Sequence, residues 1–274
     1  MSFYFYVIIY VGGNMYKEAL NILNILENRG YSSYIVGGFV RDRLLGIDSD
    51  DIDIITSATP DEISNIFNIE IKDNYGSIKL NYNNYNFDVT TFRKEFNYSD
   101  NRRPSTIEFV KDVKEDLKRR DFTINAILID KNGNYIDYVN GIEDLNNKVL
   151  RSISSIKEDA LRILRAIRFK CLYNFNFSSE LDKDIKENIN LIHNLSFDRI
   201  KQELNIIFNA SKSNVFFNIV EEYDLYKTLE IEPINALKET GNYLSVWAQL
   251  NYSNKYNFSN KEKKCIEEIK ENNR

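Results

Sequence analysis

The feature that most restricts the fold of this chain is a change in the spacing of its apolar residues near residue 142. Before that point, short segments such as 77–81 and 85–92 alternate polar and apolar residues, which is typical of half-buried strands. After it, apolar residues recur every three or four positions, which is typical of amphipathic helices. A mixed α/β half followed by an all-helical half predicts an α+β fold.

We divide the 274 residues into three segments. Residues 1–14 are interpreted as an N-terminal extension, because Met15 begins a good amphipathic helix. The apolar run 3–11 within it is far shorter than the roughly 20 residues that span a bilayer, and it lacks the basic region of a signal peptide. Residues 15–145 are predicted to form the mixed head domain, and residues 146–274 a helical neck and short body.

Finer elements follow from local signals such as Gly breaks, a Thr59-Pro60 helix start and turn pairs. In the first half we expect strands at 34–36, 51–56, 77–81, 85–92, 127–130 and 135–138, helices at 40–45 and 60–67, and a loop at 93–106. In the second half we expect helices at 156–173, 179–192, 198–210 and 213–229.

Composition excludes several kinds of catalytic site. A single histidine cannot build a His-rich metal site, and it leaves little room for a catalytic triad. The two cysteines, Cys171 and Cys265, lie far apart, which argues against a zinc ribbon or a disulfide scaffold and favours a reducing cytoplasm. The net charge of −5 means that any nucleic-acid contact comes from a local basic patch. Carboxylates, arginines and a divalent cation remain as catalytic groups.

The first candidate constellation spans residues 37–56. Gly37 and Gly38 lie between a predicted strand and helix, where backbone N–H groups can approach a phosphate, and Arg41 follows one turn later. Asp51 and Asp53 are two residues apart on a predicted strand, so both point to one face. Adjacent carboxylates repel each other unless a cation lies between them, and Mg²⁺ commonly binds one or two carboxylates together with substrate phosphates.

The second constellation is the run Arg119-Arg120-Asp121-Phe-Thr-Ile-Asn125-Ala. Arg120 can meet phosphate oxygens, whereas Asp121 and Asn125 can form hydrogen bonds with sugar hydroxyls. Taken alone, the same run is equally consistent with a charged helix end beside a buried strand.

The third constellation lies on the predicted helix 156–173. Ala160, Leu164, Ile167 and Cys171 fall on one face, which we expect to be core, with three arginines spaced by three over the opposite side. Cytosine and adenine both present an amino donor beside a ring-nitrogen acceptor on the Watson–Crick edge. A carboxylate at Asp159 with a guanidinium at Arg162 therefore suits C and A and rejects U and G. The simpler reading is a solvated face with an i,i+4 ion pair from Glu158 to Arg162.

Together these motifs resemble the class II tRNA nucleotidyltransferases and bacterial poly(A) polymerases of the polymerase-β-like superfamily. The matching segments are Val36–Thr56, the R-R-D-x-x-x-N-A run and the E-D-x-x-R run, within roughly residues 33–230. The resemblance implies a polymerase-β-like head, and it implies transfer of CMP or AMP from CTP or ATP to the tRNA 3′ acceptor end with Mg²⁺. It also implies a role for Asp159, Arg162, Arg165 and Arg168 in reading the base and contacting the triphosphate. Neither a membrane nor DNA is an expected partner.

Three activities remain open within this resemblance. The resemblance implies that members adding only CC lack a flexible loop after the segment 88–93, whereas this sequence retains a loop at 93–104. An enzyme that adds the terminal A is therefore favoured, with CCA addition first, A addition second and poly(A) synthesis third. Outside the family, a catalytically inactive RNA-binding module and a nucleotidyltransferase acting on a protein or small molecule are the alternatives. Asp88, in a segment where relatives often carry Glu, is a weaker candidate for the metal site.

Overall fold

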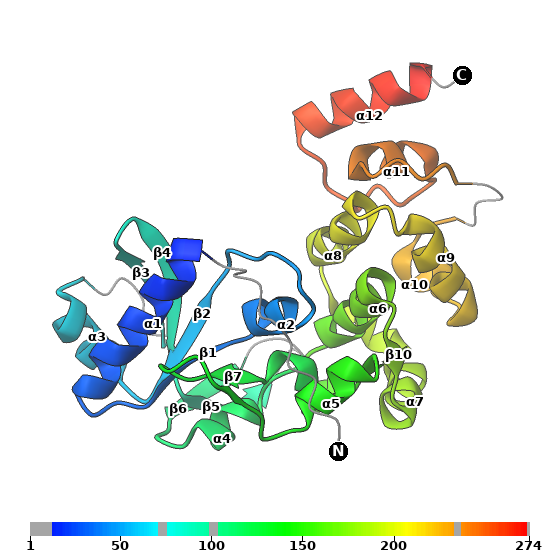
Figure 1. Cartoon of the computed structure of the whole chain (residues 1–274). Coiled ribbons are helices and arrows are strands. Elements are labelled where there is room, and N and C mark those ends of the chain that lie inside the picture. The colour runs from blue at the N-terminus through cyan, green and yellow to red at the C-terminus, as the bar shows by residue number, and fades with distance from the viewer. Residues whose placement is uncertain (1–12, 71–75, 99–103, 233–236, 273–274) are drawn as a thin grey trace. The chain divides into compact units, whose positions relative to one another are not determined.

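The computed structural model describes residues 13–70, 76–98, 104–232 and 237–272 (Figure 1). It divides into two compact units, one with the described residues up to Asn97 and from 104 to Asn147, the other with those from Lys148 onward. The first unit is a mixed α/β structure and the second is dominated by helices, so the predicted α+β fold class is confirmed. Of the segment predicted as an N-terminal extension, 1–14, only the last two residues lie within the described residues, and they belong to helix α1 (Gly13–Asn28).

The first unit is built on a six-stranded sheet with the order β3-β4-β2-β1-β7-β8. Its strands are β1 (Ser33–Val36), β2 (Asp53–Thr56), β3 (Ser77–Tyr82), β4 (Tyr85–Thr91), β7 (Leu128–Ile129) and β8 (Tyr135–Ile136). Neighbouring strands are antiparallel except β2 and β4, which run parallel with Asp53 opposite Asp88. The predicted strands are confirmed, although β2 begins at Asp53, so Asp51 lies in the loop before it and not on the strand.

The core of the first unit lies on the face of the sheet that α1 covers (Figure 1). Ala19, Ile22, Leu23 and Leu26 recur at helical spacing on α1 and are fully buried. They pack in one cluster with alternating strand residues, among them Ile54 of β2, Ile78 and Leu80 of β3, and Phe87 and Val89 of β4. Because side chains alternate between faces, Asp53 and Asp88 point to the opposite face of the sheet.

Two further helices flank the first strands. Helix α2 (Gly38–Leu44) starts directly after the Gly-Gly turn that ends β1. Helix α3 (Pro60–Phe67) has the predicted Thr59 N-cap, and Thr59 and Glu62 exchange hydrogen bonds as a capping box.

The prediction of a loop at 93–106 was wrong, because most of the described part of that segment is strand. β5 (Arg93–Tyr98) and β6 (Pro104–Phe109) form a separate two-stranded sheet. The segment is too polar to show an apolar alternation in the sequence. It is stable as a strand because its charged groups are satisfied in ion pairs, such as Arg93–Glu95 at 2.7 Å. Pro104 is tolerated because it occupies the first position of its strand.

Short helical elements complete the first unit. Helix α4 (Val113–Leu117) precedes the two arginines, and the 3₁₀ turn η1 (Thr123–Asn125) carries the middle of the R-R-D-x-x-x-N-A run. Helix α5 (Gly141–Asn146) packs on η1, and the buried Asp144 carboxylate accepts a hydrogen bond from the Thr123 hydroxyl at 2.7 Å.

The second unit consists mainly of helices. Its elements are β9 (Val149–Leu150), η2 (Ile156–Glu158), α6 (Leu161–Tyr173), β10 (Asn176–Phe177), α7 (Ser179–Asn188), η3 (Ile189–Asn194), α8 (Phe197–Asn209), α9 (Ser213–Glu222), α10 (Tyr226–Leu229), α11 (Tyr243–Gln249) and α12 (Asn260–Asn272). The prediction that this half contains no strands was wrong, because β9 and β10 form a short parallel pair. Each strand has two residues, which is too few to show a period in the sequence. In the described ranges, no helix is both long and apolar enough to cross a membrane.

Candidate active site

Three aspartates gather near the N-terminal end of β2, on the face of the sheet opposite α1. Asp53 is half-buried and pairs in register with Asp88, while Asp51 precedes it by two residues. The pKa of Asp53 is raised to about 6, chiefly by burial and also by the negative charges of Asp51 and Asp88, while Arg120 partly opposes the increase. The direction of these effects indicates one electrostatic site in which carboxylates outnumber nearby cations.

The Gly-Gly turn lies against this site. Gly37 adopts φ 86° and ψ −146°, a conformation almost restricted to glycine. A Cβ atom at Gly37 would lie 3.0 Å from Oδ2 of Asp53, so glycine is required both for the backbone and for the space. One residue later, a Cβ at Gly38 would meet only Nη2 of Arg41 at 3.5 Å. The turn, Arg41 and Asp53 therefore lie close together.

Arg41 is connected to the second motif through Asn125. The buried Arg41 guanidinium donates to Oδ1 of Asn125 at 2.7 Å and forms an ion pair with Asp42 at 2.8 Å. The Asn125 amide nitrogen donates in turn to Oδ1 of Asp121 at 3.1 Å. Both ends of the Asn125 amide thus contact protein groups, which joins residues that lie about eighty positions apart in the chain.

Sequence reasoning missed two carboxylates behind Arg120. Asp116 on α4 is fully buried and forms ion pairs with Arg119 at 2.9 Å and with Arg120 at 3.2 Å. Glu95 on β5 bonds Arg119 at 3.2 Å. The i,i+4 spacing of Asp116 and Arg120 on a helical segment was the one available sequence signal.

The E-D-x-x-R run of the second unit differs from its predicted local structure. Glu158 ends the 3₁₀ turn η2, Asp159 is extended, and α6 begins only at Leu161, so the prediction of one continuous helix from residue 156 was wrong. The reason is visible in the hydrogen bonds, because Oδ1 of Asp159 accepts from the Leu161 N–H at 2.9 Å and so starts the helix after itself. Burial raises the pKa of Asp159, and Arg162, Arg165 and Arg199 partly oppose this increase.

Arg162 lies below the surface of the second unit, and only 6% of it is exposed. Its Nη1 donates to the Ser155 carbonyl at 2.6 Å and to Glu158 at 3.0 Å. The i,i+4 pair with Glu158 is thus present, between a buried guanidinium and a carboxylate side chain that is 41% exposed. Asp159 is close enough for its pKa to be lowered by Arg162.

The remaining arginines of α6 lie beside Phe169. Arg168 forms an ion pair with Glu203 of α8 at 2.9 Å, and its guanidinium lies 5.2 Å from the Phe169 ring centre. Arg165 lies 5.9 Å from the same ring. The predicted core residues of this helix, Ala160, Leu164, Ile167 and Cys171, are all buried.

The donor set near Asp53 fits a divalent metal ion better than any other group. No three His, Cys, Asp or Glu side chains among the described residues converge closely enough to form a complete metal cage. Mg²⁺ does not need one, because it usually takes one or two carboxylates and completes its shell with water and substrate phosphates. The repulsion that raises the pKa of Asp53 is the kind that a bound cation relieves.

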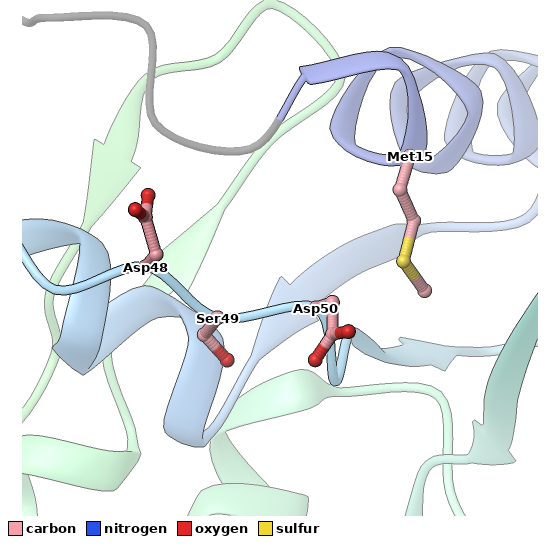
Figure 2. A pocket seen from close by; sticks show the side chains of 4 residues that line it. All are labelled: Met15, Asp48, Ser49 and Asp50. Carbon is pink, nitrogen blue, oxygen red and sulfur yellow. The ribbon is translucent and has the colours of Figure 1, made fainter.

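A pocket of about 360 Å³ lies next to this region, lined by Met15, Asp48, Ser49 and Asp50. Figure 2 shows Met15 extending from α1 toward the loop that carries the other three residues. None of these four was among the predicted site residues. Two carboxylates in the lining make the pocket unfavourable for a phosphate group, so we assign no part of the site to it.

Comparisons with known proteins match both units. Residues 33–151 match the poly A polymerase head domain family, and residues 174–233 match the family described as the probable RNA and SrmB-binding site of polymerase A. A CCA-adding enzyme of Staphylococcus haemolyticus is 44% identical over 218 residues, which are 77% of this chain and 54% of that protein. A CCA-adding enzyme of Staphylococcus aureus is 39% identical over 272 residues, which are 92% of this chain and 68% of that protein.

Solved structures that resemble this chain include CCA-adding enzymes as well. The crystal structure of the Bacillus stearothermophilus CCA-adding enzyme in complex with CTP superposes with a TM-score of 0.70 at 33% identity, covering 77% of this chain and 53% of that one. The Thermotoga maritima CCA-adding enzyme complexed with tRNA-CCA matches in fold with a TM-score of 0.72 at 21% identity, covering 96% and 72%. The chain spans about half the length of the Staphylococcus haemolyticus and Bacillus relatives.

Proposed function

Because this chain belongs to the CCA-adding enzyme family, we propose that it is a nucleotidyltransferase that extends the 3′ end of tRNA without a nucleic-acid template. In this reaction the tRNA 3′-hydroxyl attacks the α-phosphate of CTP or ATP, and pyrophosphate leaves. Relatives solved with CTP, with ATP and with tRNA support these three substrates. Two unpaired cysteines fit a reducing compartment, so we assign the reaction to the cytoplasm.

We assign the metal to the carboxylates of the first unit. Asp51 and Asp53 would hold Mg²⁺, and Asp88 pairs in register with Asp53 on the neighbouring strand. When bound, the ion would activate the attacking hydroxyl and neutralise charge on the leaving oxygen. The chain's own contribution is to keep Asp53 partly buried and close to other carboxylates, which favours uptake of a divalent cation.

The triphosphate and ribose would be held by the groups around the Gly-Gly turn. Backbone N–H groups at Gly37 and Gly38 would approach the phosphates, with Arg41 and Arg120 as cationic partners. Asp121 would accept a hydrogen bond from a ribose hydroxyl, and Asn125 would fix Asp121 and Arg41 relative to each other.

Base selection would be carried out by Asp159 and Arg162 of the second unit. The carboxylate accepts from the exocyclic amino group shared by C and A, and the guanidinium donates to the ring nitrogen beside it. Hydrogen bonds from Arg162 to Ser155 and Glu158 restrict the orientation of the guanidinium, which supports discrimination against U and G. Arg165 and Arg168 would add positive charge toward the triphosphate.

The single observation that carries the proposal is the arrangement around Asp53. Its register with Asp88, the effects of Asp51 and Arg120 on its pKa, and its approach to Gly37 bring separate sequence motifs to one point. Transfer of a nucleotidyl group needs these elements together: carboxylates for a metal, a turn for phosphates and a cation for the leaving group.

The test is incubation of the protein and Mg²⁺ with labelled CTP or ATP and with tRNA transcripts ending before, within or after the CC. Sequential addition of two C and one A supports CCA addition. Addition of A alone to a CC end indicates an A-adding enzyme, and long A tails on unrelated RNA indicate a poly(A) polymerase. If the folded protein binds tRNA but incorporates neither nucleotide, it is an inactive RNA-binding module and the proposal is refuted.

A variant sharpens this assay. Asp51→Ala should abolish incorporation while leaving the thermal unfolding temperature within a few degrees of wild type, because Asp51 is exposed and precedes β2. The matched control is Asp48→Ala, a neighbouring carboxylate on the same loop that we leave outside the site. Near-normal activity of Asp51→Ala would contradict the metal assignment.

A further inference from the structure

An unbroken chain of alternating charges runs from the start of β5 to Arg120. Arg93 bonds Glu95 at 2.7 Å, Glu95 bonds Arg119 at 3.2 Å, Arg119 bonds Asp116 at 2.9 Å, and Asp116 bonds Arg120 at 3.2 Å. The backbone N–H of Arg93 also donates to Oδ1 of Asp116 at 3.1 Å, which closes the chain on itself. Arg120 lies at one end of this series.

The two oxygens of Asp116 have separate partners. Oδ1 accepts from Arg119 and from the Arg93 backbone, and Oδ2 accepts from Arg120. Asp116 has no exposed surface, so these bonds are made away from water, where a charge-assisted hydrogen bond is strong and its loss is costly. Asp121, the residue after Arg120, accepts from the Asn125 amide at 3.1 Å, and Asn125 accepts from the Arg41 guanidinium at 2.7 Å, which connects this end of the series to the residues around the Gly-Gly turn.

We propose that Asp116 is a positioning residue that holds the Arg120 guanidinium toward the substrate phosphates. This inference rests on the proposed function. Asp116 itself does not touch the nucleotide. It fixes Arg120 from behind on the rigid helix α4, so that the side chain is already oriented before the triphosphate arrives. Phosphates are common to CTP and ATP, so this role concerns both nucleotides equally.

Glu95 supplies the matched control. It is buried to a similar extent and belongs to the same charge chain, yet it bonds Arg119 and Arg93 and is separated from Arg120 by Arg119 and Asp116. If the network only stabilised the fold, Glu95→Gln and Asp116→Asn would change stability and kinetics in parallel. If Asp116 positions Arg120, the two variants should differ in how they bind phosphate groups.

The experiment measures KM for CTP, ATP and tRNA, kcat, and inhibition by inorganic pyrophosphate. For Asp116→Asn we expect KM for both nucleotides and the inhibition constant of pyrophosphate to rise on the order of tenfold, the loss of one charge-assisted hydrogen bond. KM for tRNA should stay within about twofold, as for unrelated surface changes. Glu95→Gln should shift the nucleotide constants by less than a third of the Asp116→Asn effect.

A core variant controls for lost stability. Ile63→Val, in the buried cluster of the same unit, lowers stability without touching any charged group. Unchanged nucleotide and pyrophosphate constants in Asp116→Asn, or an equal rise in KM for tRNA, would overturn the inference. If Asp116→Asn does not fold, Glu95→Gln provides the test. A tenfold or larger rise in KM for the nucleotides and in the inhibition constant of pyrophosphate for Glu95→Gln would show that the role is not specific to Asp116, and would overturn the inference. A wild-type protein that incorporates no nucleotide would instead refute the proposed function.

Discussion

Replacement of Gly37 by alanine tests whether the turn and the carboxylate site depend on each other. Gly37 has φ 86° and ψ −146°, and an added Cβ would lie 3.0 Å from Oδ2 of Asp53. This is tighter than nine in ten Cβ contacts in real proteins, so the Asp53 carboxylate or the turn must shift by a few tenths of an ångström. We therefore expect Gly37→Ala to be less stable and to lose most nucleotide incorporation.

The magnitude follows from two contributions. A non-glycine residue in this conformation costs of order 1–3 kcal/mol. Displacing the partly buried Asp53 carboxylate adds about 1 kcal/mol, comparable to one hydrogen bond. At Gly38, the added Cβ meets Arg41 at an ordinary 3.5 Å, and alanine in a helix is favoured over glycine by about 0.4–1 kcal/mol. The two neighbouring variants should thus differ by roughly 2–5 kcal/mol.

Urea denaturation of the two variants, followed by circular dichroism, measures this difference. Gly46→Ala separates backbone strain from crowding of the Asp53 carboxylate. Gly46 has φ 72° and no atom within 4 Å of an added Cβ, so this variant reports backbone strain alone. Gly37→Ala should be less stable than Gly46→Ala. If Gly37→Ala unfolds at the same urea concentration as Gly38→Ala, the described turn is wrong. If it is unstable yet fully active, the turn does not govern Asp53.

Three further predictions concern the rest of the fold. Glu203→Ala removes the carboxylate that forms the ion pair with Arg168, and it should lower the free energy of unfolding by about 2–4 kcal/mol in thermal melts. No change in this free energy would show that the pair is not formed. Thr59→Ala removes the capping box of α3 and should cost about 1 kcal/mol in urea denaturation; a neutral result would contradict the cap. Burial raises the pKa of Cys171 to about 12. Cys171 should therefore resist a thiol reagent up to about pH 9, while the partly exposed Cys265 reacts. Two fast-reacting thiols in the native protein would refute this.

Sequence patterns predicted helices and strands correctly where the local preference and the tertiary packing favour the same conformation. The alternation of 77–82 and 85–91 predicted β3 and β4 because one face of that hairpin is core. The Thr59-Pro60 signal predicted a helix start because capping is a local interaction. The motifs around Gly37 and Asp53 could be singled out because each is short and continuous, and their catalytic role stays a prediction.

Patterns failed where distant groups decide the local structure. The two-stranded sheet of β5 and β6 escaped prediction because its polar side chains are satisfied by partners such as Arg119, which no local window reveals. The start of α6 was misplaced because one carboxylate, Asp159, ends the extended segment by bonding the Leu161 N–H. Asp116 was overlooked because an acidic residue on a short helix usually faces water, whereas here it is buried between arginines.

The parallel pairing of β2 with β4 also bears on how the protein folds. Asp53 and Asp88 are 88 − 53 = 35 residues apart, and parallel strands can pair only after a crossover connection has formed. The antiparallel β3–β4 hairpin closes over a tight turn and needs no such loop closure. Non-local contacts form more slowly than local ones. We therefore expect the β3–β4 hairpin to form before the pairing of β2 with β4 that brings Asp53 and Asp88 together.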